Sequence, residues 1–160
     1  MSDVPLAVFD VDGVVADVRH RLKHLASRPK NWQAFFAAAD RDEPLQPGLD
    51  LVHRYVRDHQ LVWLTGRPER LRVVTERWFA DHGLPAGRLL MRPDNDRRAA
   101  RDYKSDRLRR LAAGGTVAVV VDDDPEVVAR LRRDGHPVQL ADWVPHAKTL
   151  RQAQERDGRT

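Results

Sequence analysis

The chain has 160 residues, of which 41% are hydrophobic, and its formal net charge is +4. A chain of this length and composition can bury a core as one domain, which argues against a disordered protein. It contains no cysteine, which excludes disulfides, thiolate metal sites and cysteine nucleophiles from these residues.

No apolar run approaches the roughly 20 residues that a membrane helix needs. Residues 1–3 (Met-Ser-Asp) lack the basic and apolar regions of a secretory signal. We therefore expect a cytoplasmic protein without a membrane partner.

Five short apolar runs alternate along the chain with amphipathic stretches. The longest, Val117–Val121, is rich in β-branched residues, as is typical of a strand buried on both faces. Prolines stand where the intervening helices would begin and glycines where they would end. The alternation predicts an α/β fold, a parallel central sheet flanked by helices. The predicted strands are residues 6–9, 61–64, 89–91, 117–121 and 137–140.

One segment interrupts the alternation. Residues 18–45 contain two helical pieces, Arg19–Leu25 and Asn31–Ala39, but no strand. An insertion after the first strand would lie over the carboxyl ends of the strands, where open α/β sheets bind ligands. We expect a small helical lid here, within a single domain of residues 1–160, and a frayed tail from about residue 152.

Two aspartates directly follow the first apolar run. Asp10 and Asp12 lie two residues apart on an extended segment, so their side chains point the same way. Two converging carboxylates predict a cation site that also holds two acid–base groups. Gly13 allows a sharp turn beside a ligand. Calcium loops begin similarly, but the glutamate of an EF-hand is missing and a strand precedes the motif.

Three aspartates follow the fourth apolar run. Asp124 precedes Pro125 and is expected to be a helix N-cap. Asp122 and Asp123 are expected to be functional, because carboxylates are otherwise an expensive way to end a buried strand. Together with the first pair they form a cluster of hard oxygen ligands, which Mg²⁺ prefers.

A polar turn, Leu64-Thr65-Gly66-Arg67-Pro68, ends the second run. The hydroxyl of Thr65, the amide of Gly66 and the charge of Arg67 predict a phosphate cradle. A plain turn at the end of a strand is the alternative, and the coincidence with the carboxylates makes it the poorer interpretation. Lys104, at the head of a predicted helix, would neutralise a transferring phosphoryl group. Taken alone, it is one more surface lysine.

The stretch Arg92–Arg110 has eight basic and four acidic residues, so it carries the whole positive surplus of the chain. Such a field suits a phosphate-bearing partner, and Arg92, Arg97 and Arg98 are candidate contacts. A solvated arginine-rich helix face is an equally good reading.

The lid holds weaker signals. His20 and His24 have a zinc-binding spacing but no third ligand nearby, so exposed lid histidines are the better interpretation. Trp32 could stack on a nucleobase. Phe35 and Phe36 are expected to form the small core of the lid.

In this order, the motifs at Asp10 and Asp12, Thr65, Lys104, and Asp122-Asp123 resemble those of the haloacid dehalogenase (HAD) superfamily. The resemblance is closer to the phosphatase domain of phage-type polynucleotide kinase–phosphatases. It rests further on the following stretches: Ala16-Asp17 to His20-Arg21, Trp32 with Phe35-Phe36, Leu64-Thr65-Gly66-Arg67, Met91-Arg92-Pro93 and Ala141-Asp142-Trp143.

The resemblance implies a Rossmann-like HAD fold and a two-step phosphatase mechanism. Asp10 attacks phosphorus, and Asp12 protonates the leaving oxygen and then activates water. Thr65, Arg67 and Lys104 hold the phosphoryl oxygens. Mg²⁺ is bound by Asp10, the backbone carbonyl of Asp12 and Asp123, with Asp122 in support. Gly66, His20, Arg21 and Trp32 join the candidate substrate contacts.

Three hypotheses stay open at this point. The chain removes a 3′-phosphate from DNA or RNA, hydrolyses a small phosphate ester, or is a non-catalytic binding module. The intact acidic motifs argue against the third, and the basic stretch around Lys104 and the family resemblance slightly favour the first over the second. No P-loop sequence is present in these residues, so no kinase activity is expected, and no obligate protein partner is evident. Asp124 stands where many relatives have arginine, which weakens any inference about substrate contacts from that helix.

Overall fold

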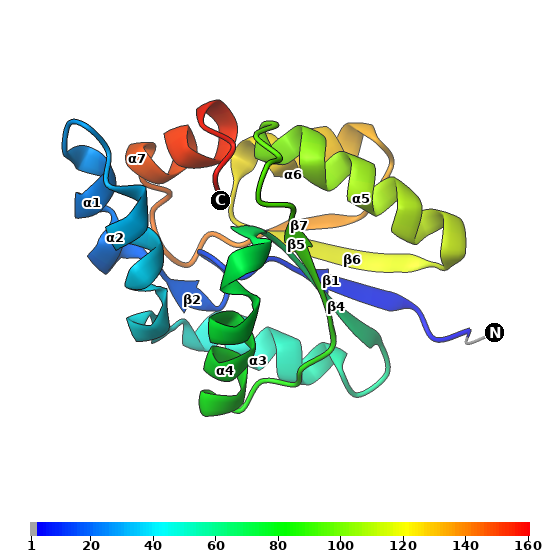
Figure 1. Cartoon of the computed structure of the whole chain (residues 1–160). Coiled ribbons are helices and arrows are strands. Elements are labelled where there is room, and N and C mark those ends of the chain that lie inside the picture. Colours follow the sequence, from blue (N-terminus) through cyan, green and yellow to red (C-terminus); the bar gives the residue numbers. More distant parts are fainter. Residues whose placement is uncertain (1–2) are drawn as a thin grey trace.

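A five-stranded parallel sheet forms the centre of the molecule (Figure 1). The structure is a computed structural model that describes residues 3–160. The strand order is β5-β4-β1-β6-β7, and every neighbouring pair is parallel. β1 is therefore central, between β4 and β6. The strands are β1 (Leu6–Phe9), β4 (Gln60–Pro68), β5 (Arg88–Arg92), β6 (Val117–Asp122) and β7 (Val138–Leu140).

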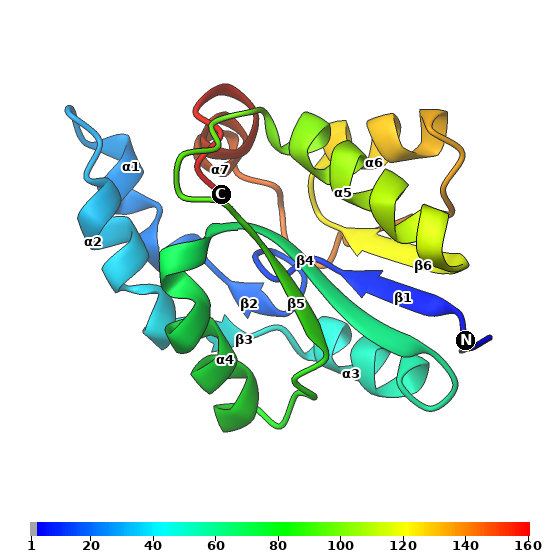
Figure 2. The same ribbon diagram turned by 45° about the vertical axis from the view of Figure 1, so that its right-hand side comes forward.

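Helices cover both faces of the sheet (Figure 2). α3 (Gln46–Tyr55) and α4 (Arg72–Asp81) pack on one face, and α5 (Ala100–Gly114) and α6 (Pro125–Arg133) pack on the other. Alternate residues of β1 serve the two cores: Phe9 lies with the first pair of helices and Val8 with the second. The predicted parallel α/β fold is confirmed.

A short 3₁₀ turn, η3 (Glu69–Leu71), separates β4 from α4, so α4 begins at Arg72 and not at Pro68. Asp124 caps α6 as predicted, since its side chain accepts a hydrogen bond from the amide of Glu126 at 2.9 Å. Among residues 3–160, no helix has the length and apolar character needed to cross a membrane.

The predicted lid follows β1. The expectation of no strand in residues 18–45 is wrong, because Glu43–Pro44 forms a short strand that pairs with Ala16–Asp17 and not with the main sheet. Phe35 and Phe36 are buried in the core of the lid with Leu25, as predicted. The elements are β2 (Ala16–Asp17), η1 (Arg19–Arg21), α1 (Lys23–Ala26), α2 (Trp32–Ala37), η2 (Ala39–Arg41) and β3 (Glu43–Pro44).

The segment from residue 152, expected from the sequence to be a frayed tail, is packed in the structure. After α7 (Lys148–Arg151), a π-helical turn, η4 (Gln152–Arg156), lies against the lid (Figure 1). Ala153 is fully buried with Phe35, and Lys30 bonds to Asp157 at 2.6 Å. The apolar contact and the ion pair tie this segment to the lid, and no local pattern in the sequence signals either of them.

Candidate active site

The three central strands deliver their polar motifs to one edge of the sheet. Asp10 follows β1, Thr65 and Arg67 lie in β4, and Asp122 ends β6. All four side chains are buried. Because parallel strands end at the same edge, residues far apart in sequence meet there.

Lys104, from α5, joins this edge. Its Nζ lies 3.1 Å from Asp10 Oδ2 and 2.6 Å from Asp122 Oδ2. Lys104 is 2% exposed, so the pairing is shielded from water. Burial alone would lower the pKa of Lys104, but Asp10 and Asp122 raise it, so the side chain is a cation.

Asp10, Asp122 and Asp123 form a carboxylate group suited to a metal ion. One oxygen of each lies within 4.8 Å of the others. Asp123 Oδ1 is buried and has no hydrogen-bond partner among the described residues. Three hard oxygen donors, one of them unsatisfied, fit Mg²⁺.

Gly13 is required beside this group. Its φ is +78°, and a Cβ placed there would lie 2.0 Å from Asp123 Oδ2. Any larger residue would therefore push Asp123 out of the carboxylate group.

The electrostatics of Asp10 and Asp12 differ sharply. Burial raises the pKa of Asp10 to about 7, although Lys104 opposes the shift. Burial alone would also raise the pKa of Asp12, but the guanidinium groups of Arg67 and Arg21 lower it to about 2. Arg67 Nη2 lies 2.7 Å from Asp12 Oδ1, and Arg21 Nη2 lies 3.2 Å from the same oxygen. Asp12 is therefore ionised at neutral pH, and metal-free Asp10 is held partly protonated.

The packed C-terminal segment enters the site. Thr160 Oγ1 donates a hydrogen bond to Asp12 Oδ2 at 3.0 Å. A Cβ on Gly66 would lie 2.2 Å from the Thr160 carbonyl carbon, so the absence of a side chain at Gly66 makes room for Thr160. Arg159 lies over the ring of Trp32, 4.9 Å from its centroid. Residues 158–160 thus lie between the lid and residues Thr65–Arg67, which were predicted to form a turn but continue β4 in the structure.

The predicted substrate residues fall into two groups. Arg21 and Arg92 are buried, and Arg92 bonds to the carbonyl oxygens of Gly66 and Arg98 at 3.1 and 2.7 Å. Arg92 therefore stabilises the backbone of β4 at Gly66. Gly66, in β4, is buried as well. The other predicted substrate residues lie nearer the surface: Trp32 is half-buried, and His20, Arg97 and Arg98 are exposed.

Sequence reasoning missed two residues of the site, Asp42 and Thr160. Asp42 is buried and bonds to both arginines that hold Asp12. Three other acidic or basic residues surround it in the sequence, and nothing in that pattern marks it out. Thr160 lies 148 residues from its partner Asp12.

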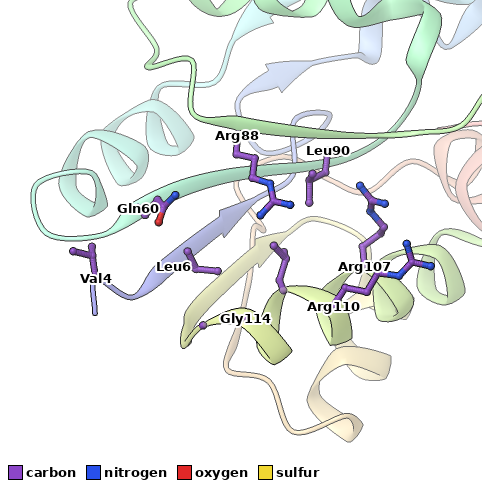
Figure 3. A pocket seen from close by; sticks show the side chains of 10 residues that line it. Val4, Leu6, Gln60, Arg88, Leu90, Arg107, Arg110 and Gly114 are labelled. Carbon is purple, nitrogen blue, oxygen red and sulfur yellow. The ribbon is translucent and has the colours of Figure 1, made fainter. Parts of the chain in front are cut away.

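The basic stretch does not form one face around Lys104. Arg107 and Arg110, together with Arg88, line a pocket of about 340 Å³ at the opposite end of the sheet, where β1 and β4 begin (Figure 3). A helix turns about 100° per residue, so consecutive basic residues of α5 point in different directions. The expectation of a single phosphate-attracting surface at residues 92–110 is therefore too simple.

The metal-free protein is expected to lose thermal stability as the pH rises from about 4 to about 7. In that interval folded Asp10, with a pKa of about 7, holds a proton that the unfolded chain has released. The pKa of Asp123 is raised in the same direction by burial. Bound Mg²⁺ would replace the proton, so it should raise Tm more at pH 8 than at pH 5.

Thermal melts in EDTA or Mg²⁺ across this pH range would measure both effects. Asp123→Asn should flatten the pH dependence and reduce the gain from Mg²⁺, whereas Asp81→Asn, on the exposed side of α4, should change neither. A Tm that rises with pH in EDTA would contradict the prediction.

Comparisons with known proteins agree with this geometry. The family model described as the polynucleotide kinase PNKP phosphatase domain matches residues 5–142. Two chains described as belonging to the Pnkp1/Rnl/Hen1 complex, in one case named an RNA repair complex, are 25% identical with a TM-score of 0.72. The match covers 88% of this chain but only 43% and 47% of those chains, so this chain spans less than half of their length.

A wider set of structures shares the fold. A haloacid dehalogenase-like hydrolase from Streptococcus pneumoniae is 11% identical with a TM-score of 0.58, over 88% of this chain and 85% of that one. A magnesium-bound HAD hydrolase from Bacillus subtilis is 11% identical with a TM-score of 0.60, over 92% and 91%. No curated protein matches the chain. Aspartates, a threonine and a lysine gather at the carboxyl ends of a HAD-type sheet, and the family model matches most of the length of the chain. The chain therefore belongs to the polynucleotide kinase PNKP phosphatase domain family and is a phosphoric monoester hydrolase.

Proposed function

We propose that this protein is a Mg²⁺-dependent polynucleotide 3′-phosphatase that works through an aspartyl-phosphate on Asp10. The observation that carries the chemistry is the buried convergence of Asp10, Lys104, Asp122 and Asp123 at one edge of the sheet. Phosphoryl transfer depends mainly on positioning and charge neutralisation, and this group supplies both.

In the first step, an oxygen of Asp10 forms a bond to phosphorus while the bond to the leaving oxygen breaks. Asp12 gives that oxygen a proton. In the second step, Asp12 takes a proton from water as the water attacks phosphorus and frees Asp10. The arginines favour ionised Asp12, which suits the second step. A dianionic phosphoryl group nearby would raise the pKa of Asp12 and so favour the protonated form that the first step needs.

The remaining residues bind the phosphoryl group or the metal ion. Lys104, Thr65 and Arg67 are proposed to hold phosphoryl oxygens. Asp10, Asp123 and Asp122, with the backbone carbonyl of Asp12, would hold Mg²⁺, which neutralises charge on the phosphoryl group when bound.

Two observations support a polynucleotide substrate. The matching family model is named for a polynucleotide enzyme, and one similar structure is described as an RNA repair complex. Exposed Arg97 and half-buried Trp32 lie beside residues 158–160 at the entrance to the site. They could contact a phosphate and a base of a strand. A small phosphate ester is the alternative. The cytoplasmic location and the absence of an obligate partner stay predictions, although two similar structures are assemblies with Rnl and Hen1.

Replacement of the nucleophile tests the mechanism. Asp10→Asn keeps the shape of the side chain but removes the attacking oxygen anion, so kcat should fall by about 10⁴-fold or more. Acid-quenched reactions with a ³²P-labelled substrate should trap labelled protein from the unmutated chain and none from Asp10→Asn. Asp81→Asn is the matched control and should behave as the unmutated chain. Near-normal turnover by Asp10→Asn would rule out the covalent mechanism.

Charge reversal at the entrance tests the substrate class. A short 3′-phosphorylated oligonucleotide should have a higher kcat/KM than the matching nucleoside 3′-monophosphate, and this advantage should shrink as salt rises. Arg97→Glu should reduce the oligonucleotide value by about 3- to 10-fold at low salt and leave p-nitrophenyl phosphate nearly unchanged. Arg98 is a weaker probe because Asp96 already pairs with it at 2.8 Å.

Arg88→Glu is the control for this experiment, because Arg88 is also exposed but lies at the opposite end of the sheet. Equal, salt-insensitive rates on oligonucleotide and mononucleotide would favour the small-ester alternative.

Removal of residues 158–160 tests whether the C-terminal segment competes with substrate. Thr160 occupies a hydrogen-bonding position on Asp12, so its loss should lower KM by several-fold and leave kcat nearly unchanged. Thr160→Val keeps the shape and removes only the hydroxyl donor, so it should give a smaller decrease. A higher KM after the deletion would show that these residues help to bind substrate.

A further inference from the structure

Asp42 is a buried carboxylate on the lid that none of the recognised motifs includes. It follows η2 and precedes β3, and its side chain is 0% exposed. Its backbone carbonyl accepts a hydrogen bond from Trp78 Nε1 of α4 at 2.8 Å. The main chain at Asp42 is thus fixed against the body of the protein.

The carboxylate of Asp42 binds both arginines that hold Asp12. Arg21 donates to it twice, from Nε to Oδ1 and from Nη2 to Oδ2, each at 2.9 Å. Arg67 donates from Nη2 to Oδ2 at 3.0 Å. The same two guanidinium groups reach Asp12, so Asp42 and Asp12 lie on either side of one pair of cations.

This arrangement fixes where the carboxylate of Asp12 points. Arg21 and Arg67 are each 1% exposed, and water cannot screen the repulsion between their charges. Asp12 alone offers one carboxylate to two guanidinium groups. The second carboxylate balances the charge, and the Nη2 atom of each arginine contacts both carboxylates.

Two neutral partners complete the network: Arg67 Nη1 bonds to Thr75 Oγ1 at 3.0 Å, and Arg21 Nη1 bonds to the Phe35 carbonyl at 3.4 Å. Together with the hydrogen bonds to Asp42 on the lid, these contacts hold the two arginines in one geometry.

We propose that Asp42 is a positioning residue for the phosphatase reaction: it holds Arg21 and Arg67 so that Asp12 is aimed at the leaving oxygen of the substrate. This inference rests on the proposed function, in which Asp12 is the general acid. Asp42 does not touch the substrate, and its effect reaches the reaction through the two arginines.

The dependence of the reaction on its leaving group tests this role. An alkyl ester, such as a nucleoside 3′-monophosphate, needs a proton on its leaving oxygen, whereas p-nitrophenolate leaves without one. Asp42→Asn keeps the shape but loses the charge. In single-turnover reactions that follow release of the leaving group, and so report the first step alone, it should lower the rate for the alkyl ester by about 10- to 100-fold, part of the roughly 10²- to 10⁴-fold that general acids supply. The loss with p-nitrophenyl phosphate in the same single-turnover reactions should be less than about 3-fold.

Asp40→Asn is the matched control, because Asp40 is exposed and only two residues away. It should leave both rates unchanged. If Asp42→Asn fails to fold, His20→Ala supplies the second test. His20 Nε2 lies 2.6 Å from Asp42 Oδ1, and its side chain is 38% exposed, so its removal loosens Asp42 with less disturbance of the core. It should show the same selective loss on the alkyl ester, smaller in size.

Equal losses on both esters, or no loss on either, would overturn the positioning role while leaving the phosphatase assignment in place. Failure of the unmutated protein to hydrolyse either ester would instead overturn the proposed function, and the inference with it.

Discussion

The buried ammonium group of Lys104 allows several carboxylates to lie close together at the carboxyl ends of the central strands. Asp10 and Asp122 lie on adjacent strands, and without a cation between them their repulsion and desolvation would oppose folding. Lys104 Nζ contacts both. Lys104 belongs to α5, and Tyr103 and Leu108 of that helix pack into the core between α5 and the sheet. The position of α5 on the sheet is therefore coupled to the charge of the active site.

The charges of the site fall into two unequal halves. On the side of the lid, Arg21 and Arg67 balance Asp12 and Asp42. On the other side, a single lysine faces a larger group of buried carboxylates, three of which, Asp10, Asp122 and Asp123, offer oxygens to one point. The half in which negative charge exceeds positive charge is suited to a divalent cation. The half in which the charges balance orients an acid–base group. This division follows from which elements supply arginine and which supply only aspartate.

Much of this architecture was predictable because its signals are local. Apolar runs that end in Asp10, Thr65 and Asp122 identified three strands and the edge where they meet, and Pro125 marked the helix capped by Asp124. Asp42 and Thr160 were not predictable. Their roles come from contacts 25 and 148 residues away in the chain, across a lid whose packing no periodic pattern encodes. The interpretation of residues 92–110 as one basic surface was wrong for a related reason. A count of charges along a sequence does not show that successive residues of a helix point in different directions.

The central position of β1 also has a consequence for how the chain folds as it is synthesised. β1 ends at Phe9, but its two neighbours begin at Gln60 and Val117. Until β6 has been made, therefore, the apolar segment Leu6–Phe9 lacks at least one of its partners, and until Lys104 has been made, Asp10 lacks the cation that compensates its burial. Such long-range parallel pairing is typical of slow folding and leaves unpaired strand edges exposed to aggregation. The strand that organises the active site is thus made before both of its neighbours, and its burial cannot be completed until β6, which ends at Asp122, has emerged from the ribosome.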